Sequence, residues 1–234
     1  FPPELAGRTR VGGLFDPNVE RIVALRPDLV VLRGRNEPVE RLCRDRHIRV
    51  YHDRTETLAD VATCIVDLGR VLDRERAAED LVRRFHARIG AIRERTAGRR
   101  RPRVFVTLNR NPQQLGHLLT AGKGTFITEM IEIAGGVNVF GEVEMAYPQV
   151  SAEAIVAKRP DVIMELMPEV AAGDAPAVRR VVLEQWSESS TLPAVRNERI
   201  HIMFDANALI PSPRYVEVID KVSRVLHPEP GGDR

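Results

Sequence analysis

Residues 75–96 read ERAAEDLVRRFHARIGAIRERT, and this stretch decides the architecture that the sequence predicts. Apolar side chains recur at the i, i+3, i+4, i+7 spacing of one helical face, and charged side chains fill most other positions. The apolar positions are Ala78, Leu81, Val82, Phe85, Ile89 and Ile92. A helix of this span is roughly 33 Å long, about the width of a small domain. Because strand-like and helix-like segments lie on both sides of it, we expect one long helix that joins two lobes.

The overall composition is ordinary for a globular chain. Of the 234 residues, 43% are hydrophobic and 29% are charged, and no apolar run approaches the length needed to cross a bilayer. The net charge of +2 gives no general reason to expect a nucleic-acid partner. The dense basic cluster GRRRPR occupies residues 98–103. We interpret it as a solvated loop before a strand, with a local nucleic-acid patch as the alternative.

Short apolar runs alternate with amphipathic stretches along the chain. Strands are predicted at residues 29–32, 48–51, 103–108, 162–166 and 200–204. Further helices are predicted at residues 19–25, 39–46, 57–72, 125–134, 150–158, 175–185 and 212–226. This alternation indicates the α/β class with mostly parallel sheets. In such sheets ligands lie beyond the carboxyl ends of the strands.

An internal repeat supports two related lobes. Residues 18–32 read NVERIVALRPDLVVL, and residues 151–165 read SAEAIVAKRPDVIME, with a constant offset of 151 − 18 = 133. Seven identities fall in register without a gap. We interpret the two copies as the same helix, tight turn and strand in each lobe. The alternative is chance recurrence of a common helix-to-strand turn.

The repeat and the long helix together predict the domain organisation. We expect a first lobe at residues 1–74, the connecting helix at residues 75–97, a second lobe at residues 98–228 and a disordered tail at residues 229–234. Two lobes joined by one stiff helix form a cleft. The loops that follow the two repeated strands are expected to face it.

Four segments carry a resemblance to a known family. In chain order they are NVERIVALRPDLVV, TAGKGTFITEMIEIAGGVNVF, YPQVSAEAIVAKRPDVIM and SPRYVEVID. The sequence resembles the periplasmic solute-binding proteins of ABC importers for iron chelates and vitamin B12, over nearly the whole chain from Phe1 to Leu226. The resemblance implies two Rossmann-like lobes with parallel sheets, joined by one long rigid helix, with the ligand cleft between them. It also implies a protein that is not an enzyme and has no catalytic residues.

The resemblance further implies what the protein binds and where it acts. Members of the family capture a metal chelate, such as a cobalamin-type cobalt corrinoid, a ferric siderophore or haem, and hold it without covalent attachment. They deliver it to a permease dimer of an ABC importer at the membrane. We therefore expect a monomer in the periplasm or another extracytoplasmic, membrane-associated location, with a small-molecule ligand and no nucleic acid.

The start of the sequence departs from the family pattern. Members begin with a leader, and a strand and helix of roughly thirty residues precede the FPPE-like segment, although domain length is only a soft guide. This sequence shows no signal peptide and begins at FPPE. We therefore expect a first lobe that is incomplete at its N-terminus, with truncation and processing both open.

Six residues are predicted to contact ligand: Arg33, Arg35, Asn109, Arg110, Tyr147 and Asp205. The arginines and Asn109 follow predicted strands, and guanidinium groups suit anionic chelates, carboxylates or a phosphate. By resemblance, vitamin B12 binders carry an aromatic residue near Tyr147 that covers the ligand, and a polar contact to the corrin edge near Asp205. An aromatic ring suits a flat macrocycle through offset stacking. The alternative for each residue is an exposed loop side chain.

Two glutamates are predicted to dock the permease. In the family, one exposed glutamate on each lobe contacts permease arginines, and Glu37 and Glu169 match by their places after the repeated strands. A carboxylate–arginine pair can be bidentate, which orients the partners. Because 169 − 37 = 132 rather than 133, Glu40 and Glu165 stay open as the true partners. The alternative is an ordinary solvated surface charge.

The remaining chemistry-bearing residues predict no direct metal site. The six histidines show no metal-ligand spacing, so a bound metal should arrive inside an organic ligand. Cys43 and Cys64 are predicted to be buried free thiols, with a disulfide left open. Trp186 is expected to pack rather than stack on a ligand. A second hypothesis of another class is a cytosolic α/β enzyme that uses Asp205, Asn109 and an arginine on a small anionic substrate at the interlobe cleft.

Overall fold

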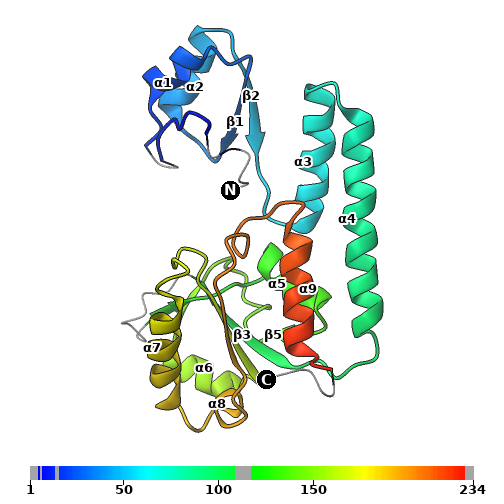
Figure 1. Cartoon of the computed structure of the whole chain (residues 1–234), viewed down its shortest axis with the longest axis vertical. Helices are drawn as coiled ribbons and strands as arrows, with labels where there is room; N and C mark the ends of the chain where they lie inside the picture. The colour runs from blue at the N-terminus through cyan, green and yellow to red at the C-terminus, as the bar shows by residue number, and fades with distance from the viewer. Residues whose placement is uncertain (1–4, 6, 14–15, 109–116, 230–234) are drawn as a thin grey trace. The chain divides into compact units, whose positions relative to one another are not determined.

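The computed structural model describes residues 5, 7–13, 16–108 and 117–229. The chain divides into two compact units, residues 1–55 and residues 56–234, which we describe separately (Figure 1). The tail expected at residues 229–234 lies outside the described residues except for Glu229. Within the described part of the chain, no helix is both long enough and apolar enough to cross a membrane.

The first unit is a small α/β layer built on two parallel strands. Its elements are α1 (Val19–Leu25), β1 (Leu29–Arg33), α2 (Glu37–Asp45) and β2 (Arg49–Asp53). The strands pair in register from Leu29 opposite Arg49 to Arg33 opposite Asp53, so both carboxyl ends meet at one edge. Asn18 caps α1 and Asn36 caps α2 through their side-chain oxygens, as Asn does in its preferred position.

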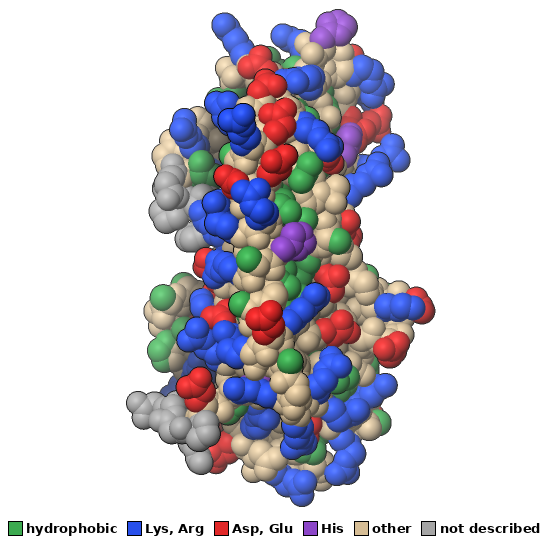
Figure 2. All heavy atoms as spheres, turned by 90° about the vertical axis from the view of Figure 1, so that its right-hand side faces the viewer, with side chains coloured by type: hydrophobic (Ala, Val, Ile, Leu, Met, Phe, Trp, Pro, Cys, Tyr) green, Lys and Arg blue, Asp and Glu red, His purple; other side chains and the backbone are tan. Residues whose placement is uncertain are grey.

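The stretch at residues 75–96 forms one continuous helix, as predicted. This helix, α4 (Glu75–Thr96), buries Phe85, Ile89 and Ile92 and packs against α3 (Leu58–Val71). Gly69 of α3 lies so close to α4 that an added Cβ would be 2.4 Å from the Cβ of Ala78. On the face shown in Figure 2, basic and acidic side chains are interspersed rather than segregated by sign. The exposed side of an amphipathic helix is expected to have this mixture.

The boundary between the compact units differs from the predicted end of the first lobe at residue 74. It falls after Thr55, because α3 makes its extensive packing contacts with α4 in the second unit. The residue pattern of α3 shows amphipathicity but does not identify the helix that covers its apolar face. The predicted lobes and the connecting role of α4 remain proposals.

The second unit contains, within the described residues, a four-stranded parallel sheet in the order β5–β3–β7–β8. Its strands are β3 (Arg103–Leu108), β5 (Val137–Asn138), β7 (Val162–Leu166) and β8 (Ile200–Met203). Helices α5 (Phe126–Ile133) and α9 (Tyr215–Leu226) share a core with α4 and one face of the sheet. The other face packs against α6 (Ala152–Lys158), α7 (Ala175–Ser187) and α8 (Pro193–Arg196) (Figure 1). The α/β class with parallel sheets is therefore confirmed.

Alternating residues along the strands divide the core into two parts. Val104 and Val106 of β3 face the α4, α5 and α9 side, whereas Phe105 faces the α6, α7 and α8 side. This period of two is the geometry of a strand buried on both faces. The sequence analysis did not predict the antiparallel pair β4 (His117–Leu119) and β6 (Gln149–Ser151), nor β5 and α8.

The internal repeat is confirmed as the same local structure in both copies. The helices α1 and α6 begin at Val19 and Ala152, and the offset of 133 holds at each helix and strand boundary. Each helix ends at an arginine in the left-handed conformation, Arg26 and Arg159, both with φ of 47°. Non-glycine residues seldom adopt this conformation, so its occurrence at both positions shows that the same turn recurs.

Candidate functional site

The carboxyl ends of β1 and β2 bring polar side chains together in the first unit. The Arg33 guanidinium donates to Asp53 Oδ2 at 3.4 Å and to the Thr55 carbonyl oxygen at 2.9 Å. Asp53 Oδ1 accepts from the Thr55 backbone N–H at 3.0 Å and also from the Thr55 hydroxyl. Arg33, predicted to contact ligand, therefore holds the end of β2 in place.

A hollow of about 410 Å³ opens beside this cluster. Its lining residues are Gly34, Arg35, Glu40, His52, Asp53 and Arg54. Arg35 was predicted from its place after β1, whereas His52 and Arg54 were missed. The parallel register, which sets Arg33 opposite Asp53, was the signal that could have identified them. Residues that follow two adjacent parallel strands share one edge of the sheet.

A loop carries Tyr147 in the second unit and is held by backbone hydrogen bonds. Gly122 N–H donates to the Ala146 carbonyl at 2.7 Å, and Lys123 N–H donates to the Val143 carbonyl at 2.8 Å. A Cβ on Gly122 would lie 2.0 Å from the Met145 carbonyl oxygen, so only glycine allows this close approach. Tyr147 is half-buried and packs against the α4, α5 and α9 side of the core. The loop therefore gives Tyr147 a defined position without burying it completely.

Asp205 follows β8, and its carboxylate already has partners. Oδ1 accepts from the Asn207 backbone N–H at 2.9 Å, and Oδ2 pairs with Lys221 of α9. Burial alone would raise the pKa of Asp205, but the hydrogen bonds from Lys221 and Asn207 outweigh it and lower the pKa. Asp205 therefore stays ionised and oriented, a fixed acceptor at the carboxyl end of the sheet. The other predicted contacts, Asn109 and Arg110, lie outside the described residues.

The four glutamates considered for docking have different environments. Glu37 is exposed at the start of α2 and pairs with Arg41 at 2.8 Å, and Glu169 is exposed after β7. Glu40 is half-buried and lines the first-unit hollow. Glu165 is 0% exposed and accepts from Trp186 Nε1 at 2.6 Å. The alternative that Glu165 docks a partner is therefore wrong, because a buried carboxylate cannot meet another protein at the surface.

Trp186 packs in the core, as predicted. It is buried in α7, and its ring meets Phe105 edge-to-face with centroids 6.1 Å apart. Edge-to-face pairs add to the stabilisation gained from burying aromatic surface. Cys43 and Cys64 are free thiols, buried and half-buried respectively, and burial raises the pKa of Cys43. The described residues contain no group of three or more His, Cys, Asp or Glu side chains that could hold a metal ion.

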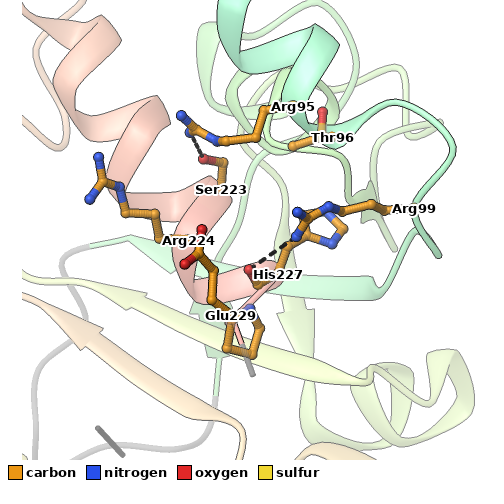
Figure 3. A pocket seen from close by; sticks show the side chains of 8 residues that line it. Arg95, Thr96, Arg99, Ser223, Arg224, His227 and Glu229 are labelled. Atoms are coloured by element: carbon orange, nitrogen blue, oxygen red, sulfur yellow. Dashed lines mark hydrogen bonds between the residues drawn. The ribbon is translucent and has the colours of Figure 1, made fainter. Parts of the chain in front are cut away.

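Another hollow, of about 440 Å³, lies where α4 and α9 end (Figure 3). Arg95 donates to Ser223 Oγ at 2.5 Å and pairs with Asp220, and Arg224 pairs with Asp220 at 2.9 Å. Burial alone would raise the pKa of Asp220, but these two arginines lower it. Arg99 donates to the His227 carbonyl at 3.5 Å. Arginines near helix carboxyl ends offset the negative end of the helix dipole. Because Arg95 of α4 also contacts Asp220 and Ser223 of α9, we interpret this cluster as a set of contacts that holds α9 against α4.

Comparisons with known proteins agree with the observed fold and indicate one protein family. A family model described as periplasmic binding protein matches residues 3–206. The vitamin B12-binding protein of Vibrio cholerae is 26% identical over 228 residues, which cover 97% of this chain and 78% of that protein. The crystal structure of the periplasmic vitamin B12 binding protein BtuF of Vibrio cholerae has a TM-score of 0.76 and 26% identity, with 97% of this chain and 84% of that chain covered.

A haem-binding protein is also structurally similar. The periplasmic heme-binding protein BhuT, solved in complex with two hemes, has a TM-score of 0.78 and 25% identity to this chain. The similarity covers 96% of this chain and 84% of that one. BtuF of Vibrio cholerae and BhuT are thus similar to this chain to about the same degree in fold and in sequence identity.

Proposed function

This chain belongs to the periplasmic binding protein family, and from that premise we propose that it is the solute-binding component of an ABC importer. It captures a metal chelate and delivers it to the permease dimer at the membrane. The observation that carries the proposal is the family match over residues 3–206, together with similarity to vitamin B12-binding and haem-binding proteins over nearly the whole chain. The enzyme hypothesis is not favoured by these relatives.

The proposed ligand is a cobalt corrinoid, a ferric siderophore or haem, held without a covalent bond. Relatives named for vitamin B12 and for haem support this range. We propose that the protein works as a monomer on the extracytoplasmic side of the membrane, and relatives named as periplasmic support this location. Ligand contacts are proposed for Arg35, Tyr147 and Asp205, with Asn109 and Arg110 retained as predicted.

The described contacts give these proposed ligand residues distinct roles. Tyr147 offers a half-buried ring on a pinned loop, suited to stacking on a flat macrocycle. Asp205 offers an ionised acceptor whose direction is set by Asn207 and Lys221. Arg33 acts on the ligand indirectly, because its guanidinium is engaged by Asp53 and Thr55. Residues oriented before binding lose less conformational entropy when the ligand arrives.

A direct test is calorimetric titration of the purified chain with cyanocobalamin, haemin and a panel of ferric siderophores. We expect one class to bind with a dissociation constant in the micromolar range or tighter, at least about 8 kcal/mol of binding free energy. Absence of heat with every class, from a chain shown to be folded by circular dichroism, would contradict the proposed function. Turnover of a small anionic substrate would support the enzyme hypothesis instead.

A further inference from the structure

We infer that the hollow at the carboxyl ends of β1 and β2 binds the carboxylates of an anionic metal chelate through Arg35 and Arg54. This inference rests on the proposed function and deepens it, because it names the chemical class of the ligand. It also assigns a binding role to Arg54 and removes that role from Arg33. The chelate could be a ferric carboxylate siderophore or haem with its two propionates, which share this chemistry.

The backbone brings the two arginines to the same edge. The last pair of the parallel ladder is Arg33 opposite Asp53, so Gly34 and Arg54 are the first residues beyond it. Gly34 has φ of 73°, a left-handed conformation that turns the chain out of β1 toward α2. Arg35 follows this turn, and both arginines are exposed and line the hollow.

Arg35 and Arg54 differ from the neighbouring Arg33 in their charge pairing. Asp53 is neutralised by Arg33 and further held by Thr55. Within the described part of the chain, neither Arg35 nor Arg54 forms an ion pair or a side-chain hydrogen bond, and Glu40 is the other acidic residue of the lining. The lining carries two arginines and two carboxylates, and Arg33 from outside the lining pairs with the carboxylate of Asp53, which leaves Arg35 and Arg54 facing the carboxylate of Glu40. Two guanidinium groups are thus available to an incoming anion.

The hollow where α4 and α9 end shows the opposite arrangement. There, Arg95 and Arg224 share the single carboxylate of Asp220. Arg99 donates to the backbone carbonyl of His227 (Figure 3). Those arginines satisfy groups of the protein itself. Comparison of the two hollows therefore favours the first-unit hollow for an external anion.

The recognition chemistry favours carboxylates. A guanidinium group binds a carboxylate through two parallel hydrogen bonds, which adds orientation to charge attraction. The first turn of α2 carries Glu37 and Glu40, so the positive charge offered to an anion comes from Arg35 and Arg54 rather than from the amino end of this helix. A chelate with two free carboxylates matches the two arginines, whereas a neutral hydroxamate chelate offers them no anionic partner.

The test compares matched anionic and neutral probes on the whole chain. Haemin is titrated against haemin dimethyl ester, which keeps the iron and macrocycle but masks both carboxylates, and ferric dicitrate against the neutral chelate ferrichrome. Cyanocobalamin serves as the corrinoid probe. We expect one anionic probe to bind at least tenfold more tightly than its neutral counterpart, and the haemin and citrate arms distinguish the two sources of carboxylate.

Variants assign the effect to the two arginines. Arg35→Gln and Arg54→Gln should each weaken binding of the anionic probe about tenfold, the size expected for one charge-assisted contact, and leave the neutral probe within about twofold. Arg49→Gln is the matched control, because Arg49 is an exposed arginine at the opposite end of β2. The double variant should also lose most of the dependence of affinity on salt concentration.

Two results would overturn the inference while leaving the proposed function intact. One is tight binding of cyanocobalamin or ferrichrome with no binding of either anionic probe. The other is binding of an anionic probe that is unchanged in Arg35→Gln and Arg54→Gln. Failure of every probe to bind the folded wild-type chain would instead reject the proposed function, and the inference with it.

Discussion

The two copies of the repeat have the same local structure in different surroundings. In the first copy, α1 leads through Arg26 into β1, and in the second, α6 leads through Arg159 into β7. Every residue of β7 is buried, because β3 and β8 flank it and helices cover both faces. Within the described residues β1 pairs only with β2, and Val31 of β1 is 52% exposed. Identical backbone geometry therefore does not imply equal burial.

The difference shows which properties of a helix–turn–strand unit are local. The capping residue, the left-handed turn and the start of the strand recur because each depends on a few neighbouring residues. The burial of the strand depends on segments that are distant in sequence. Side chains at equivalent positions in the two copies should thus contribute unequally to stability, whereas the turn residues should contribute equally.

The largest expected effect concerns the loops that follow the two repeated strands. Reversing both proposed docking charges, Glu37→Lys with Glu169→Lys, should abolish ligand uptake through the importer. Ligand affinity should stay within about threefold, under 1 kcal/mol, because both side chains are exposed and we place neither of them in the ligand site. Uptake of labelled ligand and calorimetric affinity are the two measurements.

The matched control is Glu79→Lys with Glu184→Lys, which reverses two exposed charges on α4 and α7. This control should transport normally. If the docking variant lost binding as strongly as uptake, the glutamates would belong to the ligand site instead. Loss of transport from only one of the two single variants would show that the copies differ in docking as well as in burial.

A smaller effect is expected from equivalent strand positions. Ile163→Ala in β7 should lower the free energy of unfolding by about 3 kcal/mol, because it opens a cavity in a core that excludes water. Val30→Ala, at the equivalent position of β1, should cost about 1 kcal/mol, because Val30 is half-buried and loses fewer methyl groups. Urea titration followed by circular dichroism measures both. Equal losses would mean that β1 is as well covered as β7.

The smallest effect should be the same in both copies. Arg26→Gly and Arg159→Gly should each raise the free energy of unfolding by about 0.5 kcal/mol, because glycine relieves the left-handed strain at φ of 47° but costs chain entropy. The controls are Arg21→Gly inside α1 and Lys158→Gly at the last position of α6. Each should instead lower the free energy of unfolding by about 1 kcal/mol, because glycine is a poor helix former. Thermal unfolding measures all four, and opposite signs at Arg26 and Arg159 would contradict the equivalence of the two turns.

Much of the fold was predictable from short-range patterns. The spacing of apolar residues predicted the bounds of α4, and the offset of 133 predicted both copies of the helix and strand. The short strands β4 and β6 were not predictable, because three residues carry too little periodicity and their pairing joins distant segments. The burial of Glu165 was also missed, since the sequence does not show that Trp186 supplies a hydrogen bond to it.

The candidate site was predictable only in part. Because Arg35 follows a strand, the sequence predicted that it lies at the carboxyl end of the sheet. In the structure, Arg35 lines the hollow at that end. Arg33 has the same kind of position, yet the structure engages it with Asp53 and Thr55. Arg54 and His52 were missed, because their closeness to Arg35 follows from the register of two strands rather than from sequence spacing.

The sequence by itself determined the helices other than α8, the repeated turn, the α/β class and the family, because each depends on residue order and local backbone preference. Tertiary structure alone decided which charged groups are available. It buried Glu165, paired Arg33 with Asp53 and paired Asp205 with Lys221. It left Arg35 and Arg54 facing an open hollow. The physical reason is that an ionisable side chain takes its role from the partners and solvent around it, and folding brings those partners from distant parts of the chain.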